Sequence, residues 1–157
     1  MNRLFCIFIV ACGLSSFISS AARAAEVLSG TYNTGASDTE SSNGETLDIT
    51  FHPCAEAPDR FCGTVTALHE PNGPSGDGLL PNGEPVVGFQ MIENLKPVGE
   101  GRFMRGRINA MDESFEKGEM IWYGLRVKHN ADGTLTARGC LAFICPREMV
   151  WTETEQN

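Results

Sequence analysis

The sequence is poor in cations and contains no recognisable catalytic motif. Its 12 Lys and Arg residues stand against 20 Asp and Glu, which gives a formal net charge of −8. An acidic chain of this kind is not expected to bind nucleic acid or an anionic membrane through its average charge. It contains no Gly-x-Ser-x-Gly nucleophile elbow, no phosphate-binding P-loop and no dinucleotide fingerprint. We therefore predict no nucleic-acid partner and no cofactor.

Histidine is scarce, with His52, His69 and His129 as the whole set. Nucleophilic catalysis needs a base placed beside a Ser or Cys, and a glycosidase needs two carboxylates facing each other across a cleft. The chain has carboxylates in plenty, but nothing in their spacing pairs them. We predict no catalytic residues, and an enzyme of envelope metabolites is the least favoured interpretation.

No apolar run is long enough to span a bilayer. Arg3 is followed by an apolar stretch over residues 4–10, and small residues then lead to Ala22-Arg23-Ala24. A basic N-terminal region, a short apolar core and an Ala-x-Ala cleavage motif are typical of a cleaved secretory signal. We expect a signal peptide over residues 1–24, cleaved after Ala24, and one periplasmic or secreted domain over residues 25–157.

Export changes the charge and leaves one alternative open. Removing residues 1–24 takes away two arginines and no acid, so the formal charge falls from −8 to −10. The alternative is the sequence Ile9-Val10-Ala11-Cys12, which resembles a bacterial lipobox and would place a lipid on Cys12.

Four of the six cysteines follow the expected cleavage site, and none of them has the C-x2-C spacing usual for structural zinc. An even number in an oxidising compartment indicates two disulfides, for which three connectivities exist. We favour Cys54–Cys62 and Cys140–Cys145, because each pair brackets a short expected turn. A crossed pairing and a zinc site made of His52, Cys54 and Cys62 are the alternatives.

Long amphipathic helices are also missing, and alternation with a period of two takes their place. The expected strands cover residues 27–34, 46–52, 61–68, 86–92, 102–110, 120–128, 134–140 and 143–152. Asp132-Gly133 is a strong turn signal before the last strand pair, and residues 69–84 form a long irregular stretch that could serve as a lid. We predict an all-β fold, an antiparallel up-and-down barrel of roughly eight strands.

The apolar face of these strands supplies the candidate ligand-lining residues. They share inward-facing positions of the predicted barrel, and they are Phe51, Val65, Phe89, Tyr123 and Leu125. Packing of the barrel by its own side chains is the competing interpretation, since small barrels are often filled in this way.

A set of basic residues occupies the opposite positions of three strands: Arg105, Arg107, Arg126, Lys128 and Arg138. If the apolar faces form the core, these side chains lie in solvent and pair with acids. If the interior is a mixed face, Arg138 is our candidate for binding a carboxylate or phosphate of a ligand, because it adjoins Gly139 and Cys140.

Short motifs in a fixed order run along the whole of the expected mature chain. They are Gly30-Thr31-Tyr32, Cys54 with Phe61-Cys62-Gly63, Pro85-Val86-Val87-Gly88, Gly106-Arg107-Ile108, and Leu135 with Arg138-Gly139-Cys140, Cys145 and Trp151-Thr152. In these motifs the chain resembles the exported bacterial family catalogued as domain of unknown function 2147. It departs from the family at Tyr32, where Trp is usual, and in an altered, longer hairpin over residues 109–123.

The resemblance implies a lipocalin-like β-barrel and brings no established activity or catalytic residue. Our leading hypothesis is an exported barrel that binds a small, partly apolar ligand. The alternative hypothesis is a closed-core protein of the cell envelope that acts through its surface and binds no small ligand. The sequence predicts no metal site, no transmembrane segment and no particular oligomeric state.

Overall fold

The computed structural model describes residues 26–36, 44–70, 78–80, 82–109 and 121–154. The expected signal peptide and residues 110–120 of the altered hairpin lie outside these residues. The described chain is built from strands and their connections and contains no helix.

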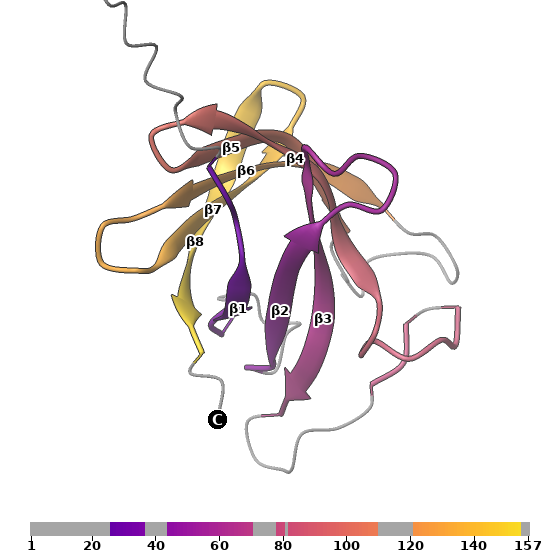
Figure 1. Ribbon diagram of the computed structural model, residues 1–157. Coiled ribbons are helices and arrows are strands. Elements are labelled where there is room, and N and C mark those ends of the chain that lie inside the picture. The colour runs from indigo at the N-terminus through magenta and orange to yellow at the C-terminus, as the bar shows by residue number, and fades with distance from the viewer. Residues whose placement is uncertain (1–25, 37–43, 71–77, 81, 110–120, 155–157) are drawn as a thin grey trace, which may run out of the picture.

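Eight strands form the fold (Figure 1). They are β1 (Gly30–Asn33), β2 (Thr46–Pro53), β3 (Phe61–His69), β4 (Gln90–Gly99), β5 (Arg102–Asn109), β6 (Trp122–His129), β7 (Leu135–Leu141) and β8 (Ile144–Glu153). Each strand pairs antiparallel with the next, and β8 pairs with β1, so the sheet closes into a barrel. The predicted fold class is confirmed.

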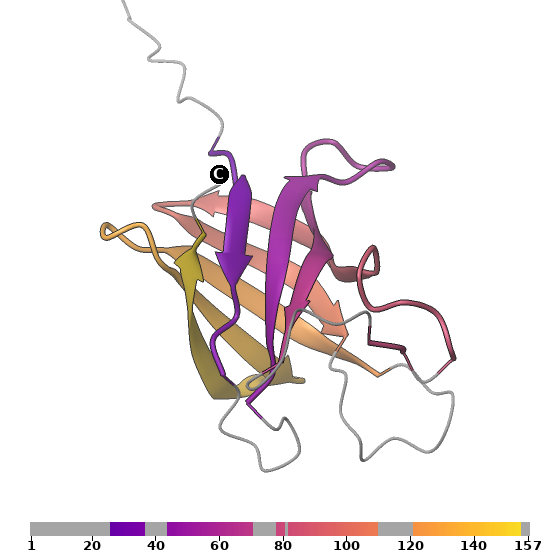
Figure 2. The same ribbon diagram turned by 90° about the horizontal axis from the view of Figure 1, so that it is seen from below.

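Antiparallel order places alternate connections at the same end of the barrel. One end, which we call the turn end, holds the short β2–β3, β4–β5 and β6–β7 connections. The other, which we call the loop end, holds the β1–β2, β3–β4 and β5–β6 connections and the β7–β8 turn. Figure 2 shows β1 and β2 in front of the broad sheet formed by β4 to β8.

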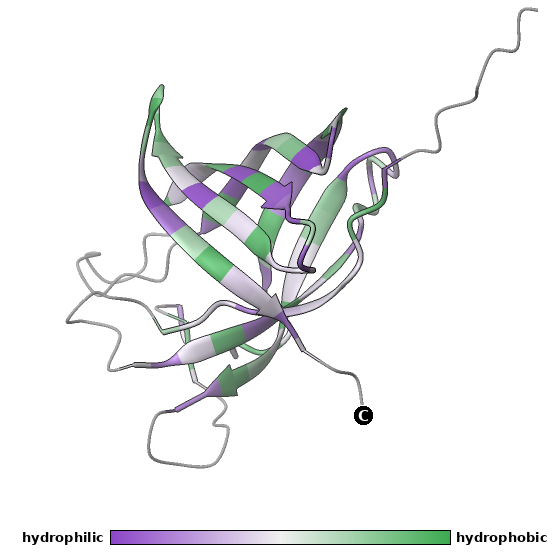
Figure 3. Cartoon of the chain, turned by 90° about the vertical axis from the view of Figure 1, so that its left-hand side faces the viewer, coloured by the Kyte–Doolittle hydropathy of each residue, from purple (hydrophilic) through white to green (hydrophobic). Residues whose placement is uncertain are grey.

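The period of two decides which side chains enter the barrel. In β2, Leu47, Ile49 and Phe51 are buried, while the residues between them are partly exposed. Outside, Thr50 links two strands through hydroxyl contacts of 2.8 Å to Thr31 and 3.1 Å to Thr66. The same alternation colours the strands in Figure 3.

Two predicted strand boundaries are corrected. β1 begins at Gly30 rather than at residue 27, because Leu28 turns into the core and Glu26 accepts a hydrogen bond from the Gly101 amide. β4 covers Gln90–Gly99 rather than residues 86–92. A bulge opposite β3 leaves Met91 without a partner, so Met91 and Ile92 are both buried.

The inward face of β5 also differs from the expected one. Alternation over residues 102–110 of the sequence predicts Met104 and Ile108 as inward residues, whereas Phe103 is buried, at 1% exposure, and Met104 is only partly buried. Arg105 has a positive φ of 62°, and the β5–β6 register shifts between Phe103 and Gly106. This extra residue moves the alternation by one position, so Ile108 faces inward again as predicted.

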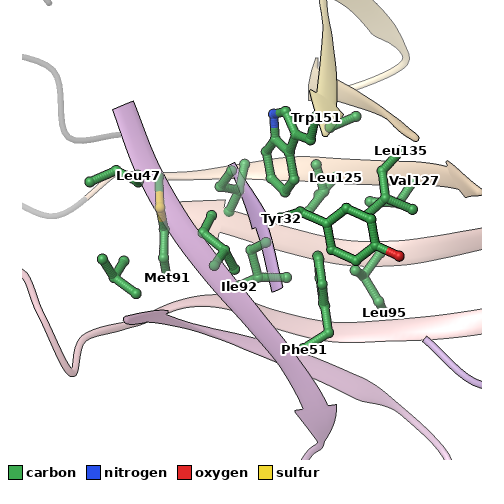
Figure 4. Close-up of a cluster of buried hydrophobic side chains, with 14 of the residues drawn as sticks. Tyr32, Leu47, Phe51, Met91, Ile92, Leu95, Leu125, Val127, Leu135 and Trp151 are labelled. Carbon is green, nitrogen blue, oxygen red and sulfur yellow. The ribbon is translucent and has the colours of Figure 1, made fainter. Parts of the chain in front are cut away.

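Large apolar side chains fill the middle of the barrel (Figure 4). Trp151, Tyr32, Phe103, Ile49, Leu95 and Leu135 are among the largest fully buried ones. Phe51 lies between two of the aromatic rings, with its centroid 5.9 Å from Tyr32 edge to face and 6.3 Å from Trp151 in a stacked arrangement. The close-up shows these three rings directed at one another from β1, β2 and β8.

Both favoured disulfides are present. Cys54 is bonded to Cys62 across the β2–β3 connection, with 5.0 Å between the Cα atoms. Cys140 is bonded to Cys145 across the β7–β8 turn. Each bridge therefore fixes one tight connection, one at each end of the barrel, and the crossed alternative is excluded.

Candidate functional site

The predicted lining residues fall into two groups that differ in burial. Phe51, Val65 and Leu125 belong to the packed middle of the barrel, with exposures of 3%, 0% and 1%. Phe89 and Tyr123 are half-buried and pack against this core from its border. Only the second group presents surface that a ligand can touch while the core stays closed.

Phe89 and Tyr123 both come from segments near the loop end. Tyr123 is the second residue of β6, where it pairs with Ile108, and Ile108 pairs in turn with Ile92. Phe89 lies three residues before Ile92, and its carbonyl accepts a hydrogen bond of 2.9 Å from the Val65 amide. Two partly exposed aromatic side chains therefore border the same row of buried isoleucines.

The described part of the predicted lid and the residues that follow it, up to Phe89, pack against the barrel. Leu80 and Val86 have exposures of 4% and 5% and belong to the core cluster. The segment is held by two hydrogen bonds, from the Val86 amide to the Gly78 carbonyl at 2.9 Å and from the Leu80 amide to the Glu84 carbonyl at 2.7 Å. A Cβ on Gly78 would lie 2.7 Å from Leu68. Residues 78–80 and 82–89 thus cover the loop end of the barrel.

Three buried side-chain polar atoms of the described residues have no hydrogen-bond partner. One is an acceptor, the Oε2 of Glu26, and two are donors: the Nε1 of Trp151, a residue of 0% exposure, and the Nδ2 of Asn109, a residue of 2% exposure. Unsatisfied buried donors are costly and uncommon in folded proteins. Asn109 is the last residue of β5 and lies at the loop end. Its side-chain amide can therefore donate a hydrogen bond to an acceptor placed there.

Tyr32 brings a phenol into the core at 2% exposure. Burial, and secondarily the negative charge of Glu153, raises the pKa of the Tyr32 phenol above its usual value. The phenol therefore stays neutral to a higher pH than an exposed tyrosine would. Sequence reasoning treated Tyr32 only as a substitute for Trp and missed this electrostatic character.

Arg138 lies on the outside of the barrel. Its side chain is 55% exposed, and its Nε donates a hydrogen bond of 2.5 Å to Glu148 on β8. Its neighbour Ala137 is the residue of β7 that faces the core, at 0% exposure. Of the two alternatives for Arg138, the structure therefore shows the solvent-facing one, because the alternation of β7 turns Ala137 into the core and Arg138 outward.

The remaining basic candidates lie outside as well. Arg105, Arg107, Arg126 and Lys128 are all exposed. Arg107 donates a hydrogen bond of 2.6 Å to Glu93, and its guanidinium lies 5.2 Å from the ring centre of Trp122. The expected pairing of surface cations with acids is seen for Arg107 and for Arg138.

The histidines provide no complete catalytic or metal site within the described residues. His69 lies 2.9 Å from Asp48, whose other oxygen accepts a hydrogen bond from the Asn33 amide. This pair is on the outer face of β2 and β3. His52 contacts Thr64 at 2.9 Å, and its neighbours Cys54 and Cys62 are oxidised, which excludes the zinc alternative.

The described chain also holds no group of three or more His, Cys, Asp or Glu side chains suited to a metal ion. None of its segments forms a helix long and apolar enough to cross a membrane.

Comparison with known proteins places this geometry in context. A search of curated proteins found no match. Among solved structures, the chain is similar to protein HP1028 from Helicobacter pylori, which is described as belonging to the lipocalin family. The two share 16% sequence identity and a TM-score of 0.59 over 83% of this chain and 84% of the other. This likeness shows a lipocalin-like barrel fold.

A family model matches residues 31–153, which include every strand of the barrel except the first residue of β1. The described features of the chain agree with the resemblance noted from its motifs, including the two bridged cysteine pairs and the buried Trp151. The chain belongs to the family described as uncharacterized protein conserved in bacteria, DUF2147.

Proposed function

We propose that the protein binds a small, partly apolar ligand at the loop end of its barrel, beneath the segment formed by residues 78–80 and 82–89. The observation that carries this proposal is the pair of half-buried aromatic side chains, Phe89 and Tyr123, on the border of a fully buried core. Small-molecule sites are typically apolar, with a few polar groups that fix orientation. The free Nδ2 of Asn109 is the polar group offered here.

In this proposal the buried residues have a supporting role. Phe51, Val65 and Leu125 form the floor on which the ligand rests, and Leu80 and Val86 move aside when it enters. Arg138 is too far toward the outer surface to contact such a ligand directly.

The two disulfides fit an oxidising compartment. We propose that the protein works in the periplasm or outside the cell after cleavage behind Ala24. The cytosol would keep such cysteines reduced, so the free-thiol content of the protein purified from the periplasm tests this part. Unpaired thiols in the mature protein would contradict it.

Binding is tested with dansyl-undecanoic acid, a fluorescent probe with an apolar chain and a carboxylate. We expect saturable enhancement of its fluorescence by the mature protein. Phe89→Ala and Tyr123→Ala should each weaken binding about tenfold, because each removes most of an apolar side chain from the site. Native mass spectrometry of the purified protein should in addition reveal co-purified lipid-like material.

Val98→Ala is the matched control. Val98 lies on β4, is 44% exposed and is not part of the core cluster, so the variant should bind like the wild type. Probe binding that is absent, or that is equal in all three variants, would contradict the proposal.

A second function, a closed-core interaction protein, is favoured by the complete burial of Ile49, Val65, Ile92 and Leu135. These side chains already fill the middle of the barrel. If the protein has a closed core, Leu80→Ala, which removes a side chain at the loop end, should bind the probe no faster than Leu135→Ala, which removes one from the packed middle. Under the ligand hypothesis only the Leu80→Ala variant binds the probe faster than the wild type.

A further inference from the structure

The positive charge of this acidic protein is concentrated on three adjacent strands. Strands β5, β6 and β7 contain no Asp or Glu, and they carry six cations: Arg102, Arg105, Arg107, Arg126, Lys128 and Arg138. The whole chain has a net charge of −8, so the rest of the molecule is much more acidic than the average suggests. We call the outward side chains of these strands the basic face.

Some of these cations face each other directly across the sheet. Arg102 is the cross-strand partner of Lys128, and Arg126 is the partner of Arg138. Like charges in directly opposite positions destabilise a sheet. Glu100 compensates Arg102 and Glu148 compensates Arg138, but within the described residues neither Arg126 nor Lys128 forms an ion pair. In each of the two pairs, therefore, one cation is compensated by an acid, and the other, Lys128 or Arg126, has no ion pair among the described residues.

An exposed apolar tip stands at the end of the same sheet. Leu141, Phe143 and Ile144 form the turn between β7 and β8, with exposures of 61%, 94% and 71%. The Cys140–Cys145 disulfide closes the base of this turn and fixes its shape. In Figure 3 the tip is the green point at the upper left, projecting from the barrel. A convex group of large apolar side chains of this kind marks an interaction site.

We propose that the basic face and the apolar tip together dock the protein on a lipid surface that carries anionic headgroups. Charge complementarity supports a polyanionic partner, and the three apolar side chains select one with a hydrocarbon layer beneath its charges. Arg138 precedes Leu141 by three residues, which is about 10 Å along a strand. Apolar groups of interfacial proteins enter the membrane by about 5–10 Å, so Arg138 would lie at the level of the headgroups.

The orientation of the protein matters for this attraction. The segment 110–120, which lies outside the described residues, adds four acids and one lysine to the sequence between β5 and β6. The molecule as a whole is repelled by an anionic surface, and only the approach with β5 to β7 and the tip in front is favourable. The contact is therefore expected to weaken strongly with salt.

The test uses the mature chain with both disulfides formed, sedimented with vesicles of phosphatidylcholine alone or mixed with phosphatidylglycerol. We expect binding to the mixed vesicles at low salt and little binding to phosphatidylcholine alone. Phe143→Ser should lower the partition coefficient about tenfold, because it removes the most exposed apolar side chain. Arg126→Ser should lower it about fivefold, and Lys128→Ser should lower it less, because Lys128 lies nearer the turn end and farther from the tip.

Matched controls separate these effects from general changes of the surface. Leu79→Ser removes an apolar side chain of 68% exposure away from the tip, and Arg60→Ser removes a cation from the β2–β3 connection. Both should bind like the wild type. The ligand-site variants Phe89→Ala and Tyr123→Ala should also bind vesicles normally. Each of the two proposals can therefore be refuted without the other.

A direct readout of insertion is the quenching of a tip tryptophan by brominated lipid in the Phe143→Trp variant. Quenching in anionic vesicles supports the proposal. It is overturned if no vesicle binding occurs at low salt, if Phe143→Ser binds like the wild type, or if neutral vesicles bind equally well. If the tip docks on a protein instead of a lipid surface, no vesicle binding at low salt is expected.

Discussion

At the scale of single residues, Tyr32 shows how one polar atom inside an apolar core makes stability depend on pH. The unfolded chain ionises this phenol at its ordinary pKa, whereas burial and Glu153 raise the pKa in the folded protein. The unfolded state therefore loses its proton first as the pH rises. Stability is complete below the ordinary pKa and is lost as the pH passes through the raised one.

We expect the free energy of unfolding of the wild type to fall between about pH 9 and about pH 11, a range that spans the usual phenol pKa. Tyr32→Phe should lose less stability over this range, because it has no buried phenol to ionise. Urea unfolding at each pH measures the effect, and the ultraviolet difference spectrum between the two proteins reports the ionisation itself. Parallel pH profiles would contradict the prediction.

Gly106 is another position where a single atom decides the packing. A Cβ at this position of β5 would lie 2.6 Å from both Cγ and Cδ2 of Leu95, a side chain of 0% exposure. Gly106→Ala should lower the free energy of unfolding by about 1–3 kcal/mol through overpacking. Gly124→Ala on β6 is the control, because its Cβ would meet Cys140 at an ordinary 3.4 Å. Equal stability of the two variants in urea would refute this account.

At the scale of elements, the two disulfides stabilise connections of similar size. The bridged cysteines are 8 residues apart in Cys54–Cys62 and 5 apart in Cys140–Cys145. Replacing either pair with serine should lower the free energy of unfolding by about 2 kcal/mol, because short loops lose modest entropy on closure. Urea unfolding of the two double variants measures this, and a loss well below 1 kcal/mol in either would show that its bridge is dispensable.

Alternation was sufficient to predict the bounds of Thr46–Pro53 and Phe61–His69, which lie within one residue of those expected. In β2 it also identifies the buried face, whereas the β2–β3 register shifts between Asp48 and Ile49, so that Val65 and Leu68 of β3 are both buried. The errors fall on bulges. The extra residues at Met91 and Arg105 shift the alternation within β4 and β5, and only contacts with neighbouring strands reveal them. Sequence periodicity holds no information about which partner strand a residue will face.

The candidate site could be predicted in part for a similar reason. Phe89 and Tyr123 were identified from their apolar pattern, and the structure places both near the loop end. The sequence could not tell a half-buried aromatic from a fully buried one such as Phe51. It also gave no sign that Leu80 would join the core, since Leu80 lies in a stretch without hydrophobic period.

At the scale of the whole molecule, the barrel is closed by the pairing of β1 with β8, which we call the seam and which is shorter than the other strand pairings. β1 has four residues, and its register with β8 consists of Tyr32 opposite Glu153 and Asn33 opposite Thr152. Thr154 adds a hydrogen bond of 2.9 Å from its amide to the Thr31 carbonyl. By comparison, the β2–β3 pairing extends along both strands from Thr46 to Pro53.

We expect amide protons at the β1–β8 seam to exchange faster than those between β2 and β3, because a short ladder opens at lower free energy than a long one. Hydrogen exchange measured by NMR on the mature protein resolves the two regions. Equal protection of both would indicate that the seam opens only when the whole barrel unfolds.

The average charge of the molecule is a poor guide to its partners. The sequence alone argues against any anionic surface, because acids outnumber cations. The folded chain gathers its cations on β5, β6 and β7, and this separation arises only when the strands are brought side by side. The docking proposal therefore rests on a property of the assembled sheet that composition does not show.

The pairing of the first strand with the last also sets the order of assembly. The hydrogen bonds from Thr154 to Thr31 join residues 123 positions apart. This contact therefore forms only after almost the whole chain has been synthesised. Until then β1 has a partner on one side only, and an unpaired strand edge is a template for association with other chains. A protein of this design depends on the rapid arrival of its C-terminal hairpin, and chains interrupted before Trp151 are expected to aggregate.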